Sequence, residues 1–186
     1  MTGYILLVLG IVLFAGAHWF KRLYPTQRAA MGDVGKGAVA VALLAAVVLM
    51  VLGYRAAPFI GVWAPPAFMV HVANVLILIA FWFFALSMIP GTMSARVRHK
   101  QLTAAKAWAI AHLLVNGDLA AIILFGGLLA WAVGSVIIIN KTAPDWDRPT
   151  PVSVRGDVIA GIAAIIAYGV VAMIHTWLGV YPFPTY

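Results

Sequence analysis

The chain has 186 residues, of which 65% are hydrophobic and only 9% are charged. Ordinary soluble domains carry about 25% charged residues, and a soluble domain of this size could not bury so much apolar surface. The composition therefore excludes a soluble globular protein and a disordered chain. The chain has no cysteine, which also excludes disulfides, thiolate metal sites and cysteine-ligated haem.

The formal net charge is +7, from 12 Lys and Arg against 5 Asp and Glu. The basic residues lie in short segments between apolar runs. In that position they indicate membrane topology and contacts with anionic lipids rather than nucleic-acid binding. We therefore predict an all-α integral membrane protein, with residues 1–186 forming one transmembrane domain in contact with the lipid bilayer.

Five apolar runs are long enough to cross a bilayer, which takes about 20 residues. In chain order they cover 3–20, 37–54, 66–89, 104–139 and 158–178. The first run has no basic segment before it, so we expect an uncleaved anchor rather than a signal peptide. The fourth run would form a helix about 54 Å long. Because two crossings of about 16 residues would leave no residues for a turn, we expect one tilted helix that begins near 101–106. The prediction is a bundle of five transmembrane helices, with six as the alternative.

The loops differ in charge. Segments 21–36 and 90–106 each carry four Lys or Arg, whereas 54–65 carries only Arg55. The positive-inside rule places the two basic loops in the cytoplasm, and the N-terminus outside. Segment 140–157 mixes both signs and is ambiguous. In the five-crossing topology the C-terminus is cytoplasmic.

Polar side chains inside a membrane are costly, so they are the first candidates for function. The chain has five histidines: His18, His71, His99, His112 and His175. His18 lies three residues before the first basic residue of 21–36, and His112 lies about 9 Å along its helix from the basic loop 90–106. In the five-crossing topology His175 shares their leaflet, whereas six crossings would place His175 on the opposite side.

Two neutral imidazoles from different helices are the ligands that a six-coordinate haem needs. Without a C-x-x-C-H motif, such a haem would be non-covalent haem b. The alternative is that these histidines lie near the membrane interface and bond only to the backbone. A carboxylate metal centre is disfavoured because the chain contains no glutamate.

Asn116-Gly117-Asp118 lies near the middle of the predicted fourth helix. Asn116 follows His112 by four residues and would share its face, whereas Asp118 would point about 120° away. One interpretation is a buried carboxyl that fixes helix packing. The other is a proton relay, or hydrogen bonding by Asn116 and Asp118 that tunes a cofactor's ligand.

The fourth run carries the residues of a family resemblance. A basic pair, Arg98-His99, precedes Trp108-Ala109-Ile110-Ala111-His112-Leu113-Leu114-Val115-Asn116-Gly117-Asp118. This pattern resembles the signature of the NnrU family, R-H-P followed by W-A-x-A-H-L-x-x-N-G-D, with Lys100 in place of the proline. Phe14-Ala15-Gly16-Ala17-His18 and Gly53-Tyr54-Arg55 also fit. The resemblance covers about 1–140.

NnrU proteins are bacterial inner-membrane proteins associated with denitrification. They are related to the 15-cis-zeta-carotene isomerase of plants and cyanobacteria, which uses haem b and histidine ligands, with a redox-dependent ligand change. By this resemblance His112 falls on a haem ligand, His18 is the second axial ligand and His175 is a reserve ligand. The isomerase's alternative cysteine ligand falls on Ala109, so that ligand change cannot operate here in the same form.

The resemblance implies a haem b-binding membrane protein, and further a haem-dependent cis–trans isomerase of a hydrophobic polyene. The alternative is a non-enzymatic accessory protein, sensor or electron-transfer factor of denitrification. Its partners would then be nitric oxide or other membrane redox proteins. A haem-free structural subunit or transporter has weaker support, because only Asp118 and the histidines could line a polar path.

Overall fold

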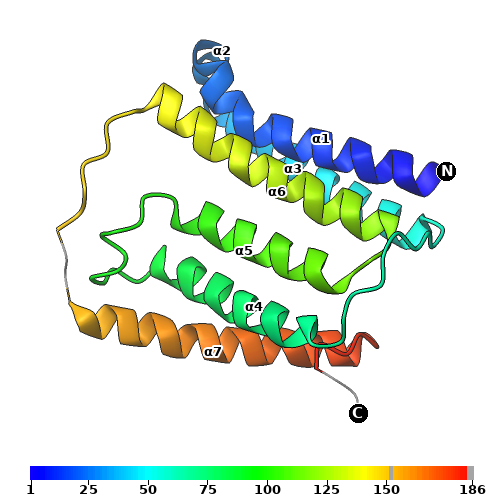
Figure 1. Cartoon of the computed structure of the whole chain (residues 1–186). Helices are drawn as coiled ribbons and strands as arrows, with labels where there is room; N and C mark the ends of the chain where they lie inside the picture. The colour runs from blue at the N-terminus through cyan, green and yellow to red at the C-terminus, as the bar shows by residue number, and fades with distance from the viewer. Residues whose placement is uncertain (151–152, 184–186) are drawn as a thin grey trace. The chain divides into compact units, whose positions relative to one another are not determined.

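A computed structural model describes residues 1–150 and 153–183 of the chain (Figure 1). These residues form helices joined by short connections, with a single isolated β-bridge between Gly61 and Asp118. The helices are α1 (Thr2–Leu23), α2 (Pro25–Ala30), α3 (Gly32–Ala56), α4 (Met69–Leu86), α5 (Lys100–Val115), α6 (Leu119–Thr142) and α7 (Val154–Trp177).

Five of these helices, α1, α3, α4, α6 and α7, are long and apolar enough to cross a membrane. In lipid a helix is favoured because it satisfies its backbone hydrogen bonds within itself. The prediction of an all-α membrane bundle is therefore confirmed.

The prediction of one continuous helix over 104–139 is wrong. The chain breaks into α5 and α6 at Asn116-Gly117-Asp118. The Asn116 amide donates to the His112 carbonyl (2.8 Å) at the end of α5. The Asp118 carboxylate accepts from the Ala121 backbone N–H (3.0 Å) and caps α6. Asn, Gly and Asp are residues that favour turns and helix caps, and here these local bonds outweigh the apolar continuity of the run.

The new turn is bonded to the segment that follows α3. The backbone N–H of Val62 donates to the Gly117 carbonyl (2.8 Å), and the Leu119 N–H donates to the Ile60 carbonyl (2.9 Å). These bonds replace the helical ones that the chain loses where α5 ends and α6 begins.

The chain divides into two compact units, each described here by itself. Unit 1 is Met1–Trp63 with Gly117–Pro144, and contains α1, α2, α3 and α6. Its core includes the fully buried Leu7, with Met50 and Ala120. Small residues let α1 and α3 approach closely: a side chain at Gly10 would lie 2.8 Å from Met50 Cγ and 2.9 Å from the Ala46 carbonyl oxygen.

Unit 2 is Ala64–Asn116 with Asp145–Tyr186, and α4 packs against both α5 and α7. Ala85, Leu86 and Ala160 form its buried cluster. At the start of α7 the Asp157 carboxylate accepts from the backbone N–H groups of Thr92 and Met93 (both 3.0 Å). The loop after α4 is thereby attached to the start of α7.

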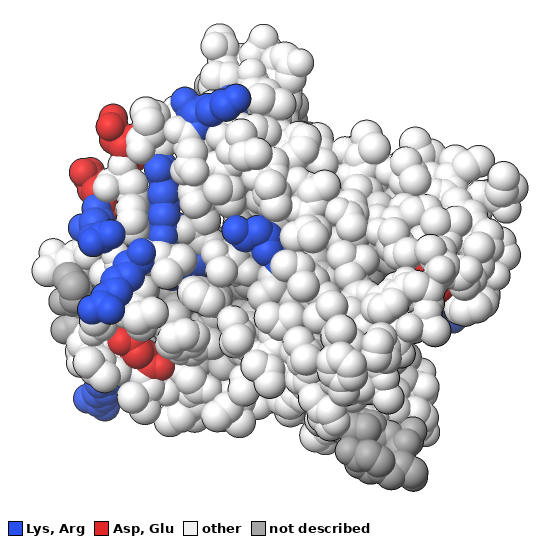
Figure 2. Space-filling model, viewed as in Figure 1, with Lys and Arg blue, Asp and Glu red and all other residues white. Residues whose placement is uncertain are grey.

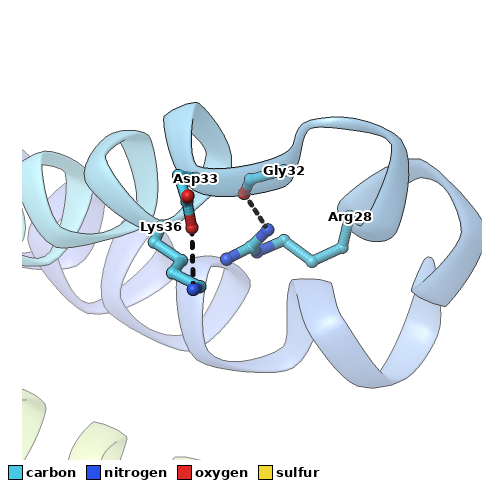
Figure 3. A network of polar contacts seen from close by, with 4 residues as sticks. All are labelled: Arg28, Gly32, Asp33 and Lys36. Atoms are coloured by element: carbon cyan, nitrogen blue, oxygen red, sulfur yellow. Dashed lines mark hydrogen bonds and ion pairs between the residues drawn. The ribbon is translucent and has the colours of Figure 1, made fainter.

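In each unit, most basic residues lie at one end (Figure 2). In unit 1 this end holds the end of α1, the start of α3 and the end of α6, with Lys21, Arg22, Arg28, Lys36 and Lys141. Figure 3 shows the short turn there: Arg28 donates to the Gly32 carbonyl (3.2 Å) and Lys36 pairs with Asp33 (2.8 Å). In unit 2 it holds the end of α4 and the starts of α5 and α7, with Arg96, Arg98, Lys100 and Arg155.

We call this the basic end of each unit and the other the opposite end. Lys141 lies at the basic end of unit 1, and Asp157 lies at the basic end of unit 2. Within unit 2, α5 runs antiparallel to α4 and back to the opposite end (Figure 1). With 16 residues, α5 is about 24 Å long, and it is not one of the five helices that are long and apolar enough to cross a membrane.

Candidate functional site

His18 lies in the last two turns of α1, in unit 1. Its Nδ1 bonds to the Phe14 carbonyl oxygen (2.9 Å). The imidazole lies against two aromatic rings, with centroid distances of 4.3 Å to Phe14 and 4.8 Å to Trp131. Among the described residues, the buried indole N–H of Trp131 has no hydrogen-bond acceptor. Its edge-on contacts with the Phe14 and His18 rings allow a weak bond to an aromatic face.

His112 lies in the last turn of α5, in unit 2, and is half-buried. Its Nδ1 bonds to the Trp108 carbonyl oxygen (2.9 Å), and its ring lies 5.0 Å from the Trp108 ring. The Asn116 amide donates to the His112 carbonyl. Trp108 and His112 of the sequence motif therefore lie one turn apart on α5, and Asn116 is its C-cap; each is linked to the next through a backbone carbonyl.

His175 lies in the last turn of α7, also in unit 2 and half-buried. Its Nδ1 bonds to the Val171 carbonyl oxygen (2.8 Å). All three histidines predicted as ligands thus anchor Nδ1 on the carbonyl four residues earlier. A carbonyl can only accept, so Nδ1 carries the proton in the neutral ring and the lone pair is on Nε2. Metal-ligating histidines show this arrangement, with the other ring N–H donated to a carbonyl or carboxylate.

The structure brings His112 and His175 to the same end of one unit. Both occupy the last turn of their helices, and these two helices begin together at the basic end of unit 2. His18 belongs to unit 1, in the half of α1 toward the basic end.

The sequence placed His112 about 9 Å along its helix from the basic loop 90–106. Because α5 begins at Lys100, the last part of that basic segment is helical. In the structure His112 lies five residues before Gly117, at the opposite end of α5 from that loop. The assignment of His18 and His112 as axial ligands did not depend on this placement alone, and it stays a prediction.

Asn116 and Asp118 do not lie in the middle of a helix as expected. Their side chains bond to backbone groups, at the end of α5 and the start of α6 respectively. Asn116 contacts the residue that carries the imidazole through its carbonyl, so it supports the position of His112. Asp118 is the N-cap of α6, a structural role that the sequence alone did not separate from proton relay.

Sequence reasoning missed a polar pair inside unit 2. The Tyr168 hydroxyl on α7 donates to the Asn74 amide oxygen on α4 (3.0 Å), and the Asn74 amide donates to the Pro182 carbonyl (3.0 Å). Asn74 could have been found, because it is a lone amide inside the apolar run 66–89. Tyr168 offered no signal, since a tyrosine in an apolar helix also suits an interface position.

The available donors suit a haem better than a bare metal ion. No group of three or more His, Asp or other ionisable ligands that could hold a metal ion occurs within residues 1–150 and 153–183. A haem brings four nitrogen ligands of its own and takes only axial ligands from the protein. Histidines with Nδ1 anchored on a carbonyl, set in apolar helices, fit that requirement.

The family model described as "NnrU protein" matches residues 6–182 of the chain. No curated protein and no solved structure matches it. The match extends beyond the 1–140 covered by the motifs and includes all of α7 up to and past His175. The chain therefore belongs to the NnrU family.

Proposed function

We propose that this NnrU protein is a haem b-binding protein of the bacterial inner membrane, with His112 as one axial ligand. The observation that carries the proposal is the shared geometry of the three histidines, each with Nδ1 held by the carbonyl one turn earlier. This anchoring fixes the tautomer and the ring orientation, as in known metal-binding histidines. The second ligand predicted from the sequence is His18, and His175 is the reserve.

Bound haem would supply reversible one-electron chemistry at iron within an apolar site. The protein's part is to hold the imidazoles, orient them and exclude water. Trp108 and Asn116 support this role, because they hold the ring and the backbone of His112 from either side. The apolar helices around the site suit a ligand or substrate that arrives from the lipid.

The activity that the resemblance implies is haem-dependent cis–trans isomerisation of a hydrophobic polyene. Ala109, at the position of the isomerase's alternative cysteine, is fully buried and has no donor atom in its side chain. An isomerase of this type would therefore have to change ligands among its histidines. The non-enzymatic alternative is a sensor, accessory or electron-transfer role with nitric oxide and membrane redox proteins in denitrification.

The test is the visible spectrum of the detergent-purified full chain, expressed with ample haem precursor, oxidised and after dithionite reduction. The proposal expects a six-coordinate haem b spectrum that is lost or altered in His112→Ala. A colourless wild-type protein would overturn it. Conversion of a cis-carotene by the reduced protein would then support the isomerase, whereas nitric oxide binding without conversion would support the sensor.

A further inference from the structure

We propose that His112 and His175 form the axial ligand pair of one haem, held entirely within unit 2. This inference rests on the proposed haem function and goes beyond it by naming the second ligand. It departs from the sequence-based choice of His18, because the structure brings His112 and His175 to the same end of one unit.

His175 faces the interior of unit 2. The buried residues Ala160, Ala164 and Ala172 recur along α7 at helical spacing, and His175 continues their stripe at about 60° from Ala160. Tyr168 belongs to the same stripe, and its bond to Asn74 turns that face of α7 toward α4. The neighbouring side chains of Met173 and Trp177 are 73% and 85% exposed, so they mark the outer face.

His112 also lies on the inner side of its helix. On a helical wheel it falls between Ala111 and Ala109, which are 1% and 0% exposed. The exposed Ile110 lies about 160° away around α5. The inward arc of α5 therefore carries His112 as its last polar residue before the turn at Asn116.

The helix arrangement suits a group held from two sides. α4 packs against both α5 and α7, whereas α5 and α7 do not pack directly against each other along their described residues. A haem held by both histidines would need such a separation, because both imidazoles would lie between the two backbones.

Two amide side chains of this end bond to other groups of the protein. Asn74 bonds to Tyr168 and to Pro182, and Asn116 bonds to the His112 carbonyl. They therefore hold the helices and the chain after α7 in place around the two histidines. His71, also at this end on α4, is exposed and serves as the control histidine.

The test compares the electron paramagnetic resonance and visible spectra of four purified, haem-loaded full-length variants with the wild type: His112→Ala, His175→Ala, His18→Ala and His71→Ala. We expect the low-spin, six-coordinate signal in wild type and in the control His71→Ala. His18→Ala tests the rival pair of His18 and His112, which would lose this signal. We expect its loss in His112→Ala and its conversion to a high-spin, five-coordinate signal in His175→Ala. Added imidazole should restore the low-spin signal in His175→Ala.

A second variant guards against misfolding. His175→Met retains a ligating side chain, and we expect it to stay six-coordinate with a raised midpoint potential, as methionine ligation raises haem potentials. A low-spin signal that survives in His175→Ala but is lost in His18→Ala would overturn the His175 assignment and leave the haem function standing. A wild type without haem would overturn both. An unchanged potential in His175→Met would also overturn the pair.

Discussion

Both units pack their helices through small residues and polar bonds, which in unit 1 include the Trp19 indole N–H donated to the Ser135 hydroxyl (2.8 Å). They differ in their histidines: unit 1 contains His18, whereas unit 2 contains His71, His99, His112 and His175. In unit 1, α1 and α3 approach closely at small residues such as Gly3, Gly10 and Gly53, and a side chain at Gly10 would overlap Met50 and Ala46. In unit 2, contacts between segments distant in sequence include polar bonds made by Asp157 and by the Asn74–Tyr168 pair.

This difference has a physical meaning. Lipid tails are as apolar as leucine, so close packing of small residues is sufficient to hold helices together. Polar groups in the membrane are costly and are retained where they have a function or a partner. His112 and His175 lie at the same end of unit 2. Unit 2 is therefore the more promising place for a ligand.

The largest expected effect tests the close packing of unit 1. Gly10→Val places methyl groups where Met50 and the Ala46 carbonyl already lie. We expect the free energy of unfolding to fall by about 3 kcal/mol or more, which corresponds to a melting temperature lower by roughly 6 °C or more. Thermal unfolding in detergent, followed by circular dichroism, measures the change.

Gly16→Val on the same helix is the matched control, because no atom lies within 4 Å of a side chain added at Gly16. It should melt within a few degrees of the wild type. Equal melting temperatures for the two variants would contradict the close approach of α1 and α3.

A smaller effect is expected at the basic end of unit 2. Asp157→Ala leaves the N–H groups of Thr92 and Met93 without their carboxylate acceptor. Loss of partners for half-buried donors should destabilise the protein by about 2 kcal/mol. The control is Asp33→Ala, whose carboxylate is exposed and pairs only with Lys36; such surface pairs contribute little. If Asp33→Ala proved as damaging as Asp157→Ala, the role given to Asp157 would be wrong.

Substitutions at Asp118 test whether this residue caps α6 or takes part in a proton relay. Asp118→Ala removes the acceptor of the Ala121 N–H and should cost about 1 kcal/mol, as for other N-caps. Asp118→Asn keeps an oxygen at the same place and should match the wild type in stability and in haem spectrum. Retained stability with a marked loss of activity in Asp118→Asn would instead favour the proton relay.

The smallest effect concerns the polar pair of unit 2. Tyr168→Phe removes the hydroxyl that donates to Asn74, and interhelical hydrogen bonds in membranes contribute about 0.6 kcal/mol on average. We expect a melting temperature lower by roughly 2 °C and a weaker low-spin signal if this bond orients the His175 face of α7. Tyr181→Phe, at an exposed tyrosine, should change neither quantity.

Most of the fold was predictable because apolar length is a strong signal. The runs near 3–20, 37–54, 66–89 and 158–178 correspond to α1, α3, α4 and α7, with helix ends differing by a few residues. The exception was 104–139. Its interruption depends on three residues, Asn116-Gly117-Asp118, whose turn-forming bonds compete with an otherwise continuous apolar helix.

That break divides the predicted fourth helix into α5, which carries His112, and α6. The sequence by itself determined the membrane class, the basic loops, the NnrU motif and the list of candidate histidines, because these follow from composition and local pattern. Only the tertiary structure decided that His112 lies at the far end of α5 from its basic loop and at the same end of unit 2 as His175. The physical reason is that proximity between helices depends on the direction in which the chain returns: within unit 2, α5 runs back antiparallel to α4, and α4 also packs against α7.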